Sequence, residues 1–484
     1  MKSQAIKRRV FSFLILLCLL LVSCATPAER ACKIGHHAWI DATCRSAKVC
    51  AVCGESEGEA LHHNWVEATC GADAFCADCG QTLAAPIGHR EDATVIMAPT
   101  CAKEGRLLYR CNVCEAEHTE AIAATGHLEG PGYCLTCGVA VENKIKNVIY
   151  IIGDGMGLEH IAAGQMVYGT HYAFTDWTRA TVNTDSISYG SASALTDSAA
   201  SGTALATGTL TTNGRIGMGP DNTQHLSTVL DYAKELGKKT GILTTDTLYG
   251  ATPAAFSAHV TNRTNYESIV LQQLSSGVDL LVGTYDSLCA GKRTQIESNG
   301  YTYVESLEDA YRNHGADKLY AQLTLEGNTS GRDAIGLSDA AAMALTYLSC
   351  EEGFVLMIEQ AYIDKFAHGN DFTKTVAMVN SLNNTVNTVL DWASGRTDTV
   401  VIVTSDHETG GLSVSREGNL ATRYPCRDGS YVYYLFESGD HTDSDVGLFL
   451  WGTSFDFSTL PYMNSSQEIK NCDIPKMIKR ILSR

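Results

Sequence analysis

Apolar runs without alternating polar positions recur along the chain after residue 144. They cover residues 147–152, 240–244, 278–282, 354–358 and 399–404. Runs of this kind are typical of strands that helices cover on both faces. Segments with helical spacing separate the runs. The pattern therefore predicts an α/β fold with a mainly parallel sheet sandwiched by helices. In such a fold the polar residues that carry chemistry gather at the carboxyl ends of the strands.

The first residues of the chain combine a basic start with a short apolar run. A basic segment at residues 2–9 precedes the apolar residues 10–22, and the sequence LVSC ends at Cys24. This order resembles the lipobox of bacterial lipoproteins, in which cleavage precedes a cysteine that then carries lipid. We therefore expect a signal peptide at residues 1–23, lipidation of Cys24 and a linker at residues 24–31. The lipid would hold the exported chain on the outer face of a bacterial membrane, at the cell surface or in the periplasm. An uncleaved anchor and an ordinary secretory signal are the alternatives.

Residues 32–140 form a repeat that is rich in cysteine and histidine. This segment contains 12 of the 18 cysteines of the chain, and the first copy recurs 26 residues later. A looser third copy follows, and Cys134 and Cys137 begin a truncated one. The cysteines and histidines are Cys44, Cys50, Cys53 and His63 in the first copy, Cys70, Cys76, Cys79 and His89 in the second, and Cys101, Cys111, Cys114 and His127 in the third.

Units this short cannot bury a sufficient apolar core, so they need cross-links. Three thiols and one imidazole are typical of a closed, structural Cys₃His zinc site, which we expect within each copy. Disulfides are the alternative, because exported thiols usually oxidise. An odd number of cysteines in each copy would then force pairing between copies. We interpret the module as a stalk or as an interaction module that binds a surface partner.

The charge balance limits the classes of ligand. The chain has 36 Lys and Arg against 54 Asp and Glu, a net charge of −18. Such a chain is not expected to bind nucleic acid, because a phosphate backbone requires a basic face. A phosphate-handling enzyme is still compatible with this charge, since bound metal ions supply positive charge locally.

Candidate chemistry begins where the predicted strands end. Asp154 lies on a glycine-flanked turn directly after the run at 147–152, where a carboxylate can face a metal ion or a phosphate. Ser198 opens a run of small residues that ends near Gly208 and predicts a helix. The free N–H groups of a first helical turn favour an alkoxide and an incoming phosphate. Taken alone, an ordinary Asp-Gly turn explains the first feature equally well, and an N-cap serine explains the second feature better.

Further candidates follow along the chain. The hydroxyl of Thr252 suits a hard cation, and the planar fork of Arg263 suits two phosphate oxygens. Asp364 and His368 are spaced i,i+4, so they share one face of a helical turn. The remaining candidates at the ends of apolar runs or ahead of one are Glu359, Asp406, His407 and His441. Histidines and aspartates suit two zinc ions, and oxygen ligands alone suit a third, harder cation. One zinc would activate the serine, while the other would stabilise the leaving oxygen or bind the attacking water.

The motifs DGMG, TDSAASGTA, ATPAA with AHVTNR, MIEQAYIDKFAH, TSDHETGG and HT occur in this order. Together they resemble the alkaline phosphatase family over about residues 145–455. The resemblance implies a catalytic domain of that fold at residues 144–484, a phosphoserine at Ser198 and phosphate binding by Arg263. It implies two zinc ions and one magnesium ion, and it is compatible with a homodimer. The implied ligands are Asp364, His368 and His441 for the first zinc, Asp154, Asp406 and His407 for the second, and Asp154, Thr252 and Glu359 for magnesium.

One position departs from the family pattern. The family usually carries Asp or His where Gly250 stands, and that side chain supports the magnesium. We therefore expect water to fill the remaining positions of this site, and magnesium binding to persist but weaken.

The expected function is metal-dependent hydrolysis of small extracytoplasmic phosphate monoesters. A phosphodiesterase, or another phospho- or sulfo-hydrolase of the same superfamily, is the alternative. Arg263 favours monoesters, because its fork fits two free phosphoryl oxygens that a diester lacks. No Cys-x-Pro-x-Arg sequence of the sulfatase kind occurs in the chain. A non-enzymatic alternative is a surface interaction protein with a relic hydrolase domain. That alternative is disfavoured because every ligand position of the motifs except Gly250 is intact.

Overall fold

The structure is a computed structural model that describes residues 26–126, 136–137, 144–188, 195–327, 334–460, 463 and 469–483. The chain divides into two compact units, Met1–Gly126 and His127–Arg484. Cys24, His127 and the predicted signal peptide at residues 1–23 lie outside the described residues, so their roles stay predictions. None of the described helices combines the length and the apolar composition that crossing a membrane requires.

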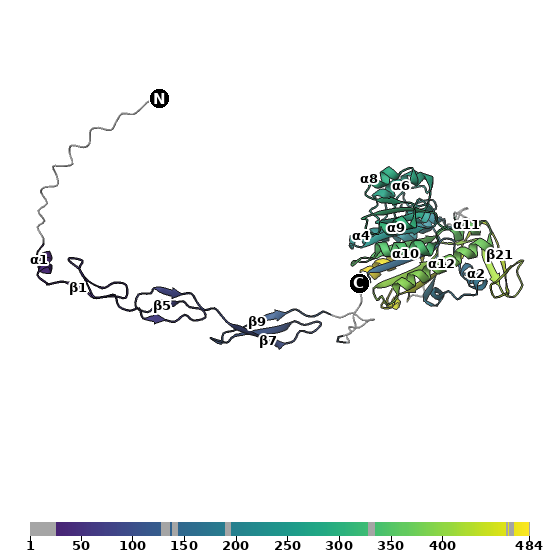
Figure 1. Cartoon of the computed structure of the whole chain (residues 1–484). Helices are drawn as coiled ribbons and strands as arrows, with labels where there is room; N and C mark the ends of the chain where they lie inside the picture. Colours follow the sequence, from purple (N-terminus) through teal and green to yellow (C-terminus); the bar gives the residue numbers. More distant parts are fainter. Residues whose placement is uncertain are drawn as a thin grey trace, which may run out of the picture. The chain divides into compact units, whose positions relative to one another are not determined.

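The first unit contains the helix α1 (Pro27–Lys33) and three small antiparallel sheets (Figure 1). In its described part, the buried residues are seven cysteines, Ala74 and Gly105. Cysteine side chains therefore take the place of an apolar core here, as the short repeats predict. The strands are β1 (Trp39–Ile40), β2 (Lys48–Cys50) and β3 (Ser56–Glu57) in the first sheet, β4 (Trp65–Val66), β5 (Ala74–Cys76) and β6 (Thr82–Ala84) in the second, and β7 (Glu91–Met97), β8 (Gly105–Cys111) and β9 (Glu117–Ile122) in the third.

The expectation that each copy of the repeat gathers its own cysteines and histidine is wrong. Cys44 of the first copy lies with His63 and with the Cys-x-x-Cys pair of the second copy, Cys76 and Cys79. The β1–β2 loop that carries Cys44 is held against the chain just before His63, because the N–H of Leu61 donates to the carbonyl of Thr43 at 2.9 Å. Each group of ligands therefore joins two successive copies.

The second unit is built on a ten-stranded sheet. Its order is β14-β15-β13-β12-β16-β10-β17-β23-β11-β24. The seven strands from β14 to β17 are parallel, whereas β23 runs antiparallel to both β17 and β11. The strands are β10 (Asn147–Gly153), β11 (Thr178–Asn183), β12 (Lys239–Thr244), β13 (Leu280–Thr284), β14 (Thr302–Val304), β15 (Leu319–Leu323), β16 (Phe354–Gln360), β17 (Thr399–Thr404), β23 (Val446–Trp451) and β24 (Ile469–Lys470).

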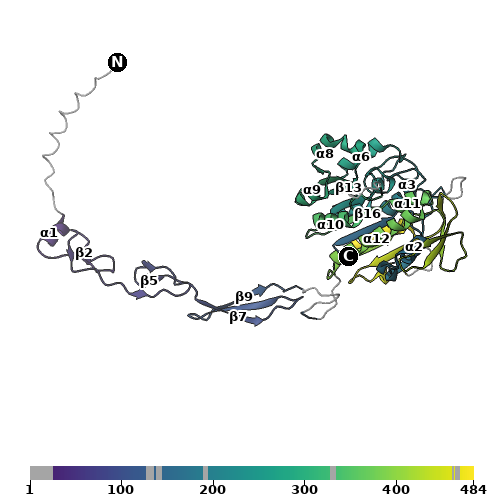
Figure 2. The same cartoon turned by 45° about the vertical axis from the view of Figure 1, so that its right-hand side comes forward.

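Helices cover both faces of this sheet (Figures 1 and 2). Along β10, Tyr150 and Ile152 pack with one set of helices, and Ile149 and Ile151 pack with the other. A strand whose successive residues are all buried needs such a double cover, which explains its unbroken apolar run. One face carries α3 (Ser198–Thr207), α4 (Val229–Glu235), α5 (Ala251–Ala255), α6 (Tyr266–Ser275) and α13 (Ile474–Leu482), and the other carries α2 (Leu158–Tyr168), α9 (Leu307–Arg312), α10 (Leu337–Leu348), α11 (Tyr362–His368) and α12 (Phe372–Ala393).

The predicted mainly parallel α/β sheet is confirmed, and the five apolar runs correspond to β10, β12, β13, β16 and β17. The helices α7 (Ser287–Ala290) and α8 (Arg293–Ser298) complete the region near β14. Two small sheets lie beyond β17 in the sequence. They consist of β18 (Glu408–Thr409) with β22 (His441–Thr442), and of β19 (Leu412–Ser415), β21 (Tyr431–Phe436) and β20 (Thr422–Pro425).

Candidate active site

The candidate site lies at the carboxyl ends of three neighbouring parallel strands, β10, β16 and β17. Asp154 follows β10 directly, and Glu359 is the last residue but one of β16. Asp406 and His407 follow β17. Because Ile152 is paired with both Glu359 and Thr404 in the sheet, the three strands end at one level. The sheet thus brings together the polar residues that the strand ends predicted.

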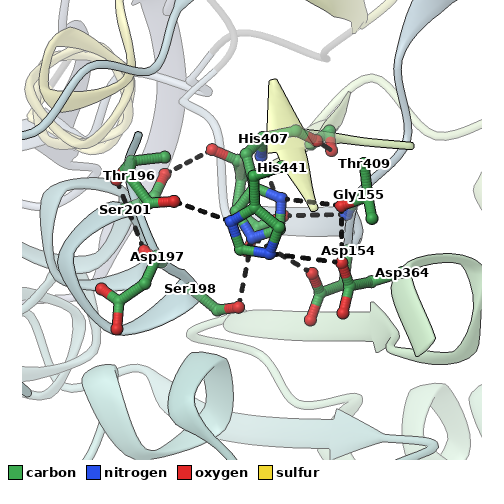
Figure 3. A network of polar contacts seen from close by, with 12 residues as sticks. Asp154, Gly155, Thr196, Asp197, Ser198, Ser201, Asp364, His407, Thr409 and His441 are labelled. Atoms are coloured by element: carbon green, nitrogen blue, oxygen red, sulfur yellow. Dashed lines mark hydrogen bonds and ion pairs between the residues drawn. The ribbon is translucent and has the colours of Figure 1, made fainter. Parts of the chain in front are cut away.

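Ser198 is the first residue of α3, at the helix end where N–H groups are free. Asp197 is the N-cap, and its side chain accepts a hydrogen bond from the N–H of Ala200 at 2.9 Å. Ser198 is therefore not used as the cap, and its buried Oγ lies 3.2 Å from Nε2 of His407. Figure 3 shows the serine side chain directed towards the imidazole. A hydroxyl in this position is near the positive end of the helix dipole, which stabilises a developing alkoxide.

Arg263 lies beside the same helix end. Its Nη1 donates a hydrogen bond to Oδ2 of Asp197 at 3.1 Å. The side chain is 38% exposed, so the guanidinium reaches the rim of the site. One carboxylate thus caps α3 and also fixes the guanidinium, which keeps the arginine close to Ser198.

A first group of possible metal ligands consists of Asp364, His368 and His441. Nε2 of His368 lies 3.4 Å from Oδ1 of Asp364, and Nε2 of His441 lies 3.6 Å from the same oxygen. Nδ1 of His368 donates to the carbonyl of Gly439 at 2.6 Å, and Nδ1 of His441 donates to the carbonyl of Thr196 at 2.7 Å. A carbonyl only accepts, so both rings carry the proton on Nδ1. In the neutral form of each ring, Nε2 therefore has a free lone pair for a cation.

A second group surrounds His407. Its Nε2 lies 3.2 Å from Oδ2 of Asp406 and 3.6 Å from Oδ1 of Asp154. The hydroxyl of Thr409 gives its single proton to Asp364 at 2.6 Å, so it can only accept from Nδ1 of His407, 3.3 Å away. The proton of His407 is therefore also on Nδ1, and its Nε2 faces Ser198 and the carboxylates. The ligand atoms of Asp154, Asp364 and His407 all lie within 4.8 Å of one another.

These carboxylates are placed where negative charge is costly. Burial, together with Asp406 and Asp364, raises the pKa of Asp154 well above its usual value. Burial and Asp364 raise the pKa of Asp406 to about 8. Burial, His441 and His368 hold the pKa of His407 well below its usual value. Oδ1 of Asp154 and Oδ2 of Asp406 are buried without a hydrogen-bond partner. Buried carboxylate oxygens that lack partners fit a site built for cations.

A third group, formed by oxygen atoms, lies near Glu359. Burial, with Asp246 as the second cause, raises the pKa of Glu359 to about 7. Oγ1 of Thr252 is buried without a hydrogen-bond partner. An orphaned hydroxyl beside a buried carboxylate is the donor set that a hard cation prefers.

The chain matches a known family over most of this unit. Residues 145–280 and 290–471 match the alkaline phosphatase family. The chain belongs to the alkaline phosphatase family. The match covers the strand ends that carry all the candidate catalytic residues.

The sequence of the chain is also similar to those of individual alkaline phosphatases. The chain is 29% identical over 311 residues to alkaline phosphatase 3 of Bacillus subtilis, covering 57% of this chain and 64% of that protein. It is 30% identical over 389 residues to the repressible alkaline phosphatase of Saccharomyces cerevisiae, covering 69% and 65%. The chain thus spans less than two thirds of the length of these relatives.

Solved structures of alkaline phosphatases share the fold. A mutant of the alkaline phosphatase of the Antarctic bacterium TAB5, with Mg bound in its M3 site, is 25% identical, with a TM-score of 0.60. The alignment covers 71% of this chain and 99% of that one. The Thermus thermophilus alkaline phosphatase has a TM-score of 0.60 at 22% identity, covering 75% and 96%. This second likeness concerns the fold alone.

Beside Gly250, where the sequence predicts that water completes the magnesium site, the structure places a carboxylate. A Cβ atom added to Gly250 would lie 2.7 Å from Oδ2 of Asp246, so that carboxylate occupies the space of the missing side chain. Oδ1 of Asp246 also forms an ion pair with Nζ of Lys365 at 2.5 Å. A carboxylate is thus present near the third group, but it comes from a loop position four residues earlier.

Sequence reasoning missed three residues that shape the site. They are Asp197, which caps α3 and holds Arg263, Asp246, and Thr409, which joins His407 to Asp364. Asp197 precedes a predicted helix, which is an N-cap signal that could have found it. Asp246 and Thr409 carry no local signal, because their roles depend on neighbours distant in the sequence.

Proposed function

We propose that the protein hydrolyses phosphate monoesters through a phosphoserine on Ser198. The observation that supports this most is the position of the Ser198 hydroxyl, 3.2 Å from Nε2 of His407 at the first turn of α3. The serine, the imidazole and the buried carboxylates belong to one site. Membership of the alkaline phosphatase family supports the same reaction class.

The donor sets fit two zinc ions and one magnesium ion. Asp364, His368 and His441 would hold the first zinc. Asp154, Asp406 and His407 would hold the second, next to Ser198, and Asp364 lies between the two sets. Asp154, Thr252 and Glu359 would hold magnesium with oxygens alone. When bound, these ions would lower the pKa of a coordinated hydroxyl and stabilise negative charge on the phosphoryl and leaving oxygens.

The protein residues perform the remaining steps. The Ser198 oxygen gives up its proton and forms a bond to phosphorus, while the bond from phosphorus to the alcohol oxygen breaks and that oxygen takes up a proton. Water then attacks the phosphoserine, so that inorganic phosphate leaves and Ser198 recovers its proton. The N–H groups of the first turn of α3 stabilise charge on the serine and phosphate oxygens. Arg263 binds two phosphoryl oxygens, and Asp197 keeps its fork in place.

Substrate class is tested by the response of two ester types to loss of Arg263. The full chain is expected to hydrolyse an aryl phosphate far faster than an aryl phosphodiester. In Arg263→Ala, kcat/KM for the monoester should fall roughly 10- to 1000-fold, because charge-assisted bonds to two free oxygens are lost. Diester hydrolysis should fall less, since a diester offers fewer free oxygens.

Arg263→Lys is the matched control, because it keeps the charge and removes the fork. The kcat/KM of Arg263→Lys for the monoester should lie between the values of wild type and of Arg263→Ala. Equal losses on both esters in Arg263→Ala would remove the argument for monoester specificity. Absence of turnover on either ester in the metal-loaded wild type would favour the relic interpretation.

The carboxylate of Asp246 acts in the third site in place of a side chain at position 250. Asp246→Asn is expected to raise the magnesium concentration for half-maximal activation roughly 10- to 100-fold, the usual cost of losing an outer partner of a metal site. The double variant Asp246→Ala with Gly250→Asp should recover part of this loss, because the carboxylate returns from the adjacent position. Magnesium titration of monoesterase activity measures both effects.

Gly250→Asp alone serves as the contrast. It sets a second carboxylate against Asp246 and should not tighten magnesium binding. If Asp246→Asn responds to magnesium as wild type does, Asp246 has no part in the third site.

The proposed location and partners of the protein are inferred from its sequence. The chain would be exported and anchored on the outer face of a bacterial membrane by lipid on Cys24, and its repeat array would hold a surface partner or space the enzyme from the membrane. Incorporation of a labelled fatty acid that Cys24→Ala does not reduce would contradict the anchor. The substrates would then be small extracytoplasmic phosphate monoesters, and a homodimer is compatible with the family.

A further inference from the structure

Nine cysteines and three histidines in the described part of the first unit gather in three groups of identical composition. Each group has three thiols and one imidazole, and its ligand atoms all lie within 4.8 Å of one another. The groups are Cys32, His37, Cys50 and Cys53; Cys44, His63, Cys76 and Cys79; and Cys70, His89, Cys111 and Cys114. Because the three groups have the same composition and recur along the chain, we compare how the backbone builds each of them.

A tight turn forms the Cys-x-x-Cys part of every group. The N–H of Gly54 donates to the carbonyl of Cys50 at 3.0 Å, and the N–H of Gly80 donates to that of Cys76 at 2.8 Å. Both glycines have positive φ, which closes the turn after the second cysteine. At the third group, Glu115 donates to the carbonyl of Cys111 at 2.9 Å. The second and third strands of each sheet flank this turn, so both thiols point to one place.

A backbone bond places the histidine opposite the turn. The N–H of Ala77 donates to the carbonyl of Asn64 at 2.8 Å, which sets His63 beside Cys76. Asn112 donates to the carbonyl of Arg90 at 2.9 Å and sets His89 beside Cys111 in the same way. One sheet thus supplies three of the four ligands.

The fourth ligand comes from the preceding segment of the chain. Cys44 lies in the β1–β2 loop and Cys70 in the β4–β5 loop, whereas Cys32 lies on α1. The N–H of Leu61 donates to the carbonyl of Thr43 at 2.9 Å, and the N–H of Ile87 donates to that of Thr69 at 3.0 Å. These bonds hold the loop of one sheet against the segment that leads to the next sheet. Each group therefore sits at a joint between consecutive parts of the module.

The distances match a tetrahedral zinc site. With bonds of about 2.3 Å to sulfur, two thiolates on one zinc ion lie about 3.8 Å apart, and a thiolate and an imidazole nitrogen lie about 3.5 Å apart. The Sγ–Sγ distances are 3.6 Å for Cys32 with Cys50 and 3.8 Å for Cys44 with Cys76. The Sγ–Nδ1 distance is 3.5 Å for Cys79 with His63. A disulfide would require sulfur atoms about 2.05 Å apart and would leave an odd thiol in each group.

We propose that the three described groups bind three structural zinc ions, each of which closes a joint by taking one thiolate from the preceding segment and three ligands from the following sheet. The small sheets bury mainly cysteine, so bound zinc supplies the stability that an apolar core supplies elsewhere. The ions fix each sheet to the next as well as folding each sheet. The module is then a chain of zinc-locked joints, and this assignment is independent of the phosphatase reaction.

Two double variants of the full chain distinguish joint sites from sites within a copy. Cys44→Ser with Cys79→Ser removes two ligands of one joint, and so is expected to reduce bound zinc by one ion per chain. Cys44→Ser with Cys53→Ser removes ligands of two joints, and is expected to reduce it by two. Sites within single copies predict the reverse order. Bound zinc is counted by elemental analysis after the protein is separated from free metal.

Alkylation of thiols gives a second measurement that does not depend on the total count. In the zinc-loaded single variant Cys44→Ser, mass spectrometry should find Cys76 and Cys79 reactive and Cys50 and Cys53 protected. The matched variant Cys70→Ser should expose Cys111 and Cys114 instead. Reaction of Cys50 and Cys53 in Cys44→Ser, or equal reaction of all thiols of the module, would overturn the assignment.

Cobalt absorption distinguishes metal bound by this module from metal bound by the catalytic unit. The candidate catalytic ligands include no cysteine, so thiolate-to-cobalt absorption in the full chain reports the module alone. We expect each of the three described groups to contribute one thiolate-bound cobalt ion to this absorption. Its absence, together with a mass that shows disulfides in the purified chain, would overturn the proposal and leave the phosphatase function untouched.

Discussion

Replacement of Ser198 by alanine is expected to reduce kcat for phosphate monoesters at least about 1000-fold and to abolish the trapped phosphoenzyme. The hydroxyl is the candidate nucleophile, and its Oγ is the atom directed at His407 from the first turn of α3. Residual hydrolysis is expected, because Arg263 and the remaining ligands still bind the phosphoryl group and can favour direct attack by water. Single-turnover assays and acid quenching measure the two effects.

The controls separate lost chemistry from lost structure. Ser198 is buried and small, so alanine leaves little space unfilled, and the zinc content of the catalytic unit should not change. Asp197 still caps α3 in the variant through its bond to Ala200. If phosphate in acid-quenched wild type maps to a residue other than Ser198, or if the alanine variant keeps full turnover, the assignment of the nucleophile is wrong.

Continuous burial explains which part of the fold the sequence could predict. β10, β16 and β17 are buried throughout because helices cover both their faces, and the apolar run inside each strand is an unambiguous local pattern. Their carboxyl ends are adjacent in a parallel sheet, so Asp154, Glu359 and Asp406 were predicted to meet. The strands at one edge of the sheet were harder to predict from the sequence, because β14 has only three residues and β15 contains Gln322. Packing against neighbours, rather than local pattern, makes these segments strands.

The pairing of partners distant in the sequence could not be predicted from local spacing. A repeat fixes the kinds of ligand in each copy, but a ligand such as Cys44 has equivalent candidates in its own copy and in the next. The backbone bond from Leu61 to Thr43, which is a tertiary feature, decides between them. Asp246 is a similar case, since only the folded loop shows its carboxylate in the space beside Gly250. Both features depend on approaches between backbone segments that carry no sequence motif.

Exhaustive chelation is expected to abolish monoesterase activity, and zinc with magnesium is expected to restore it. Three imidazoles direct Nε2 to the site and use Nδ1 for a hydrogen bond, and two carboxylate oxygens there are buried without partners. Without cations, Arg263 and the helix end would be left to balance the charge of the phosphoryl oxygens. Assays of the chelated and reloaded full chain measure the effect. Activity that survives complete removal of metal would contradict the two-zinc interpretation.

The metal-free protein is further expected to lose stability as the pH rises. The pKa of Asp406 is raised to about 8 by burial and by Asp364, whereas an unfolded aspartate has a pKa of about 3.9. Between these values the folded state binds a proton that the unfolded state has released, so the free energy of unfolding falls with rising pH. This contribution is fully present below about pH 4 and is lost as the pH passes through about 8.

Thermal unfolding of the chelated chain at about pH 5 and about pH 9 should show the decline, and Asp406→Asn should reduce it. Zinc should remove the decline, because it stabilises the ionised carboxylate, so equal slopes with and without metal would exclude Asp406 from the zinc site.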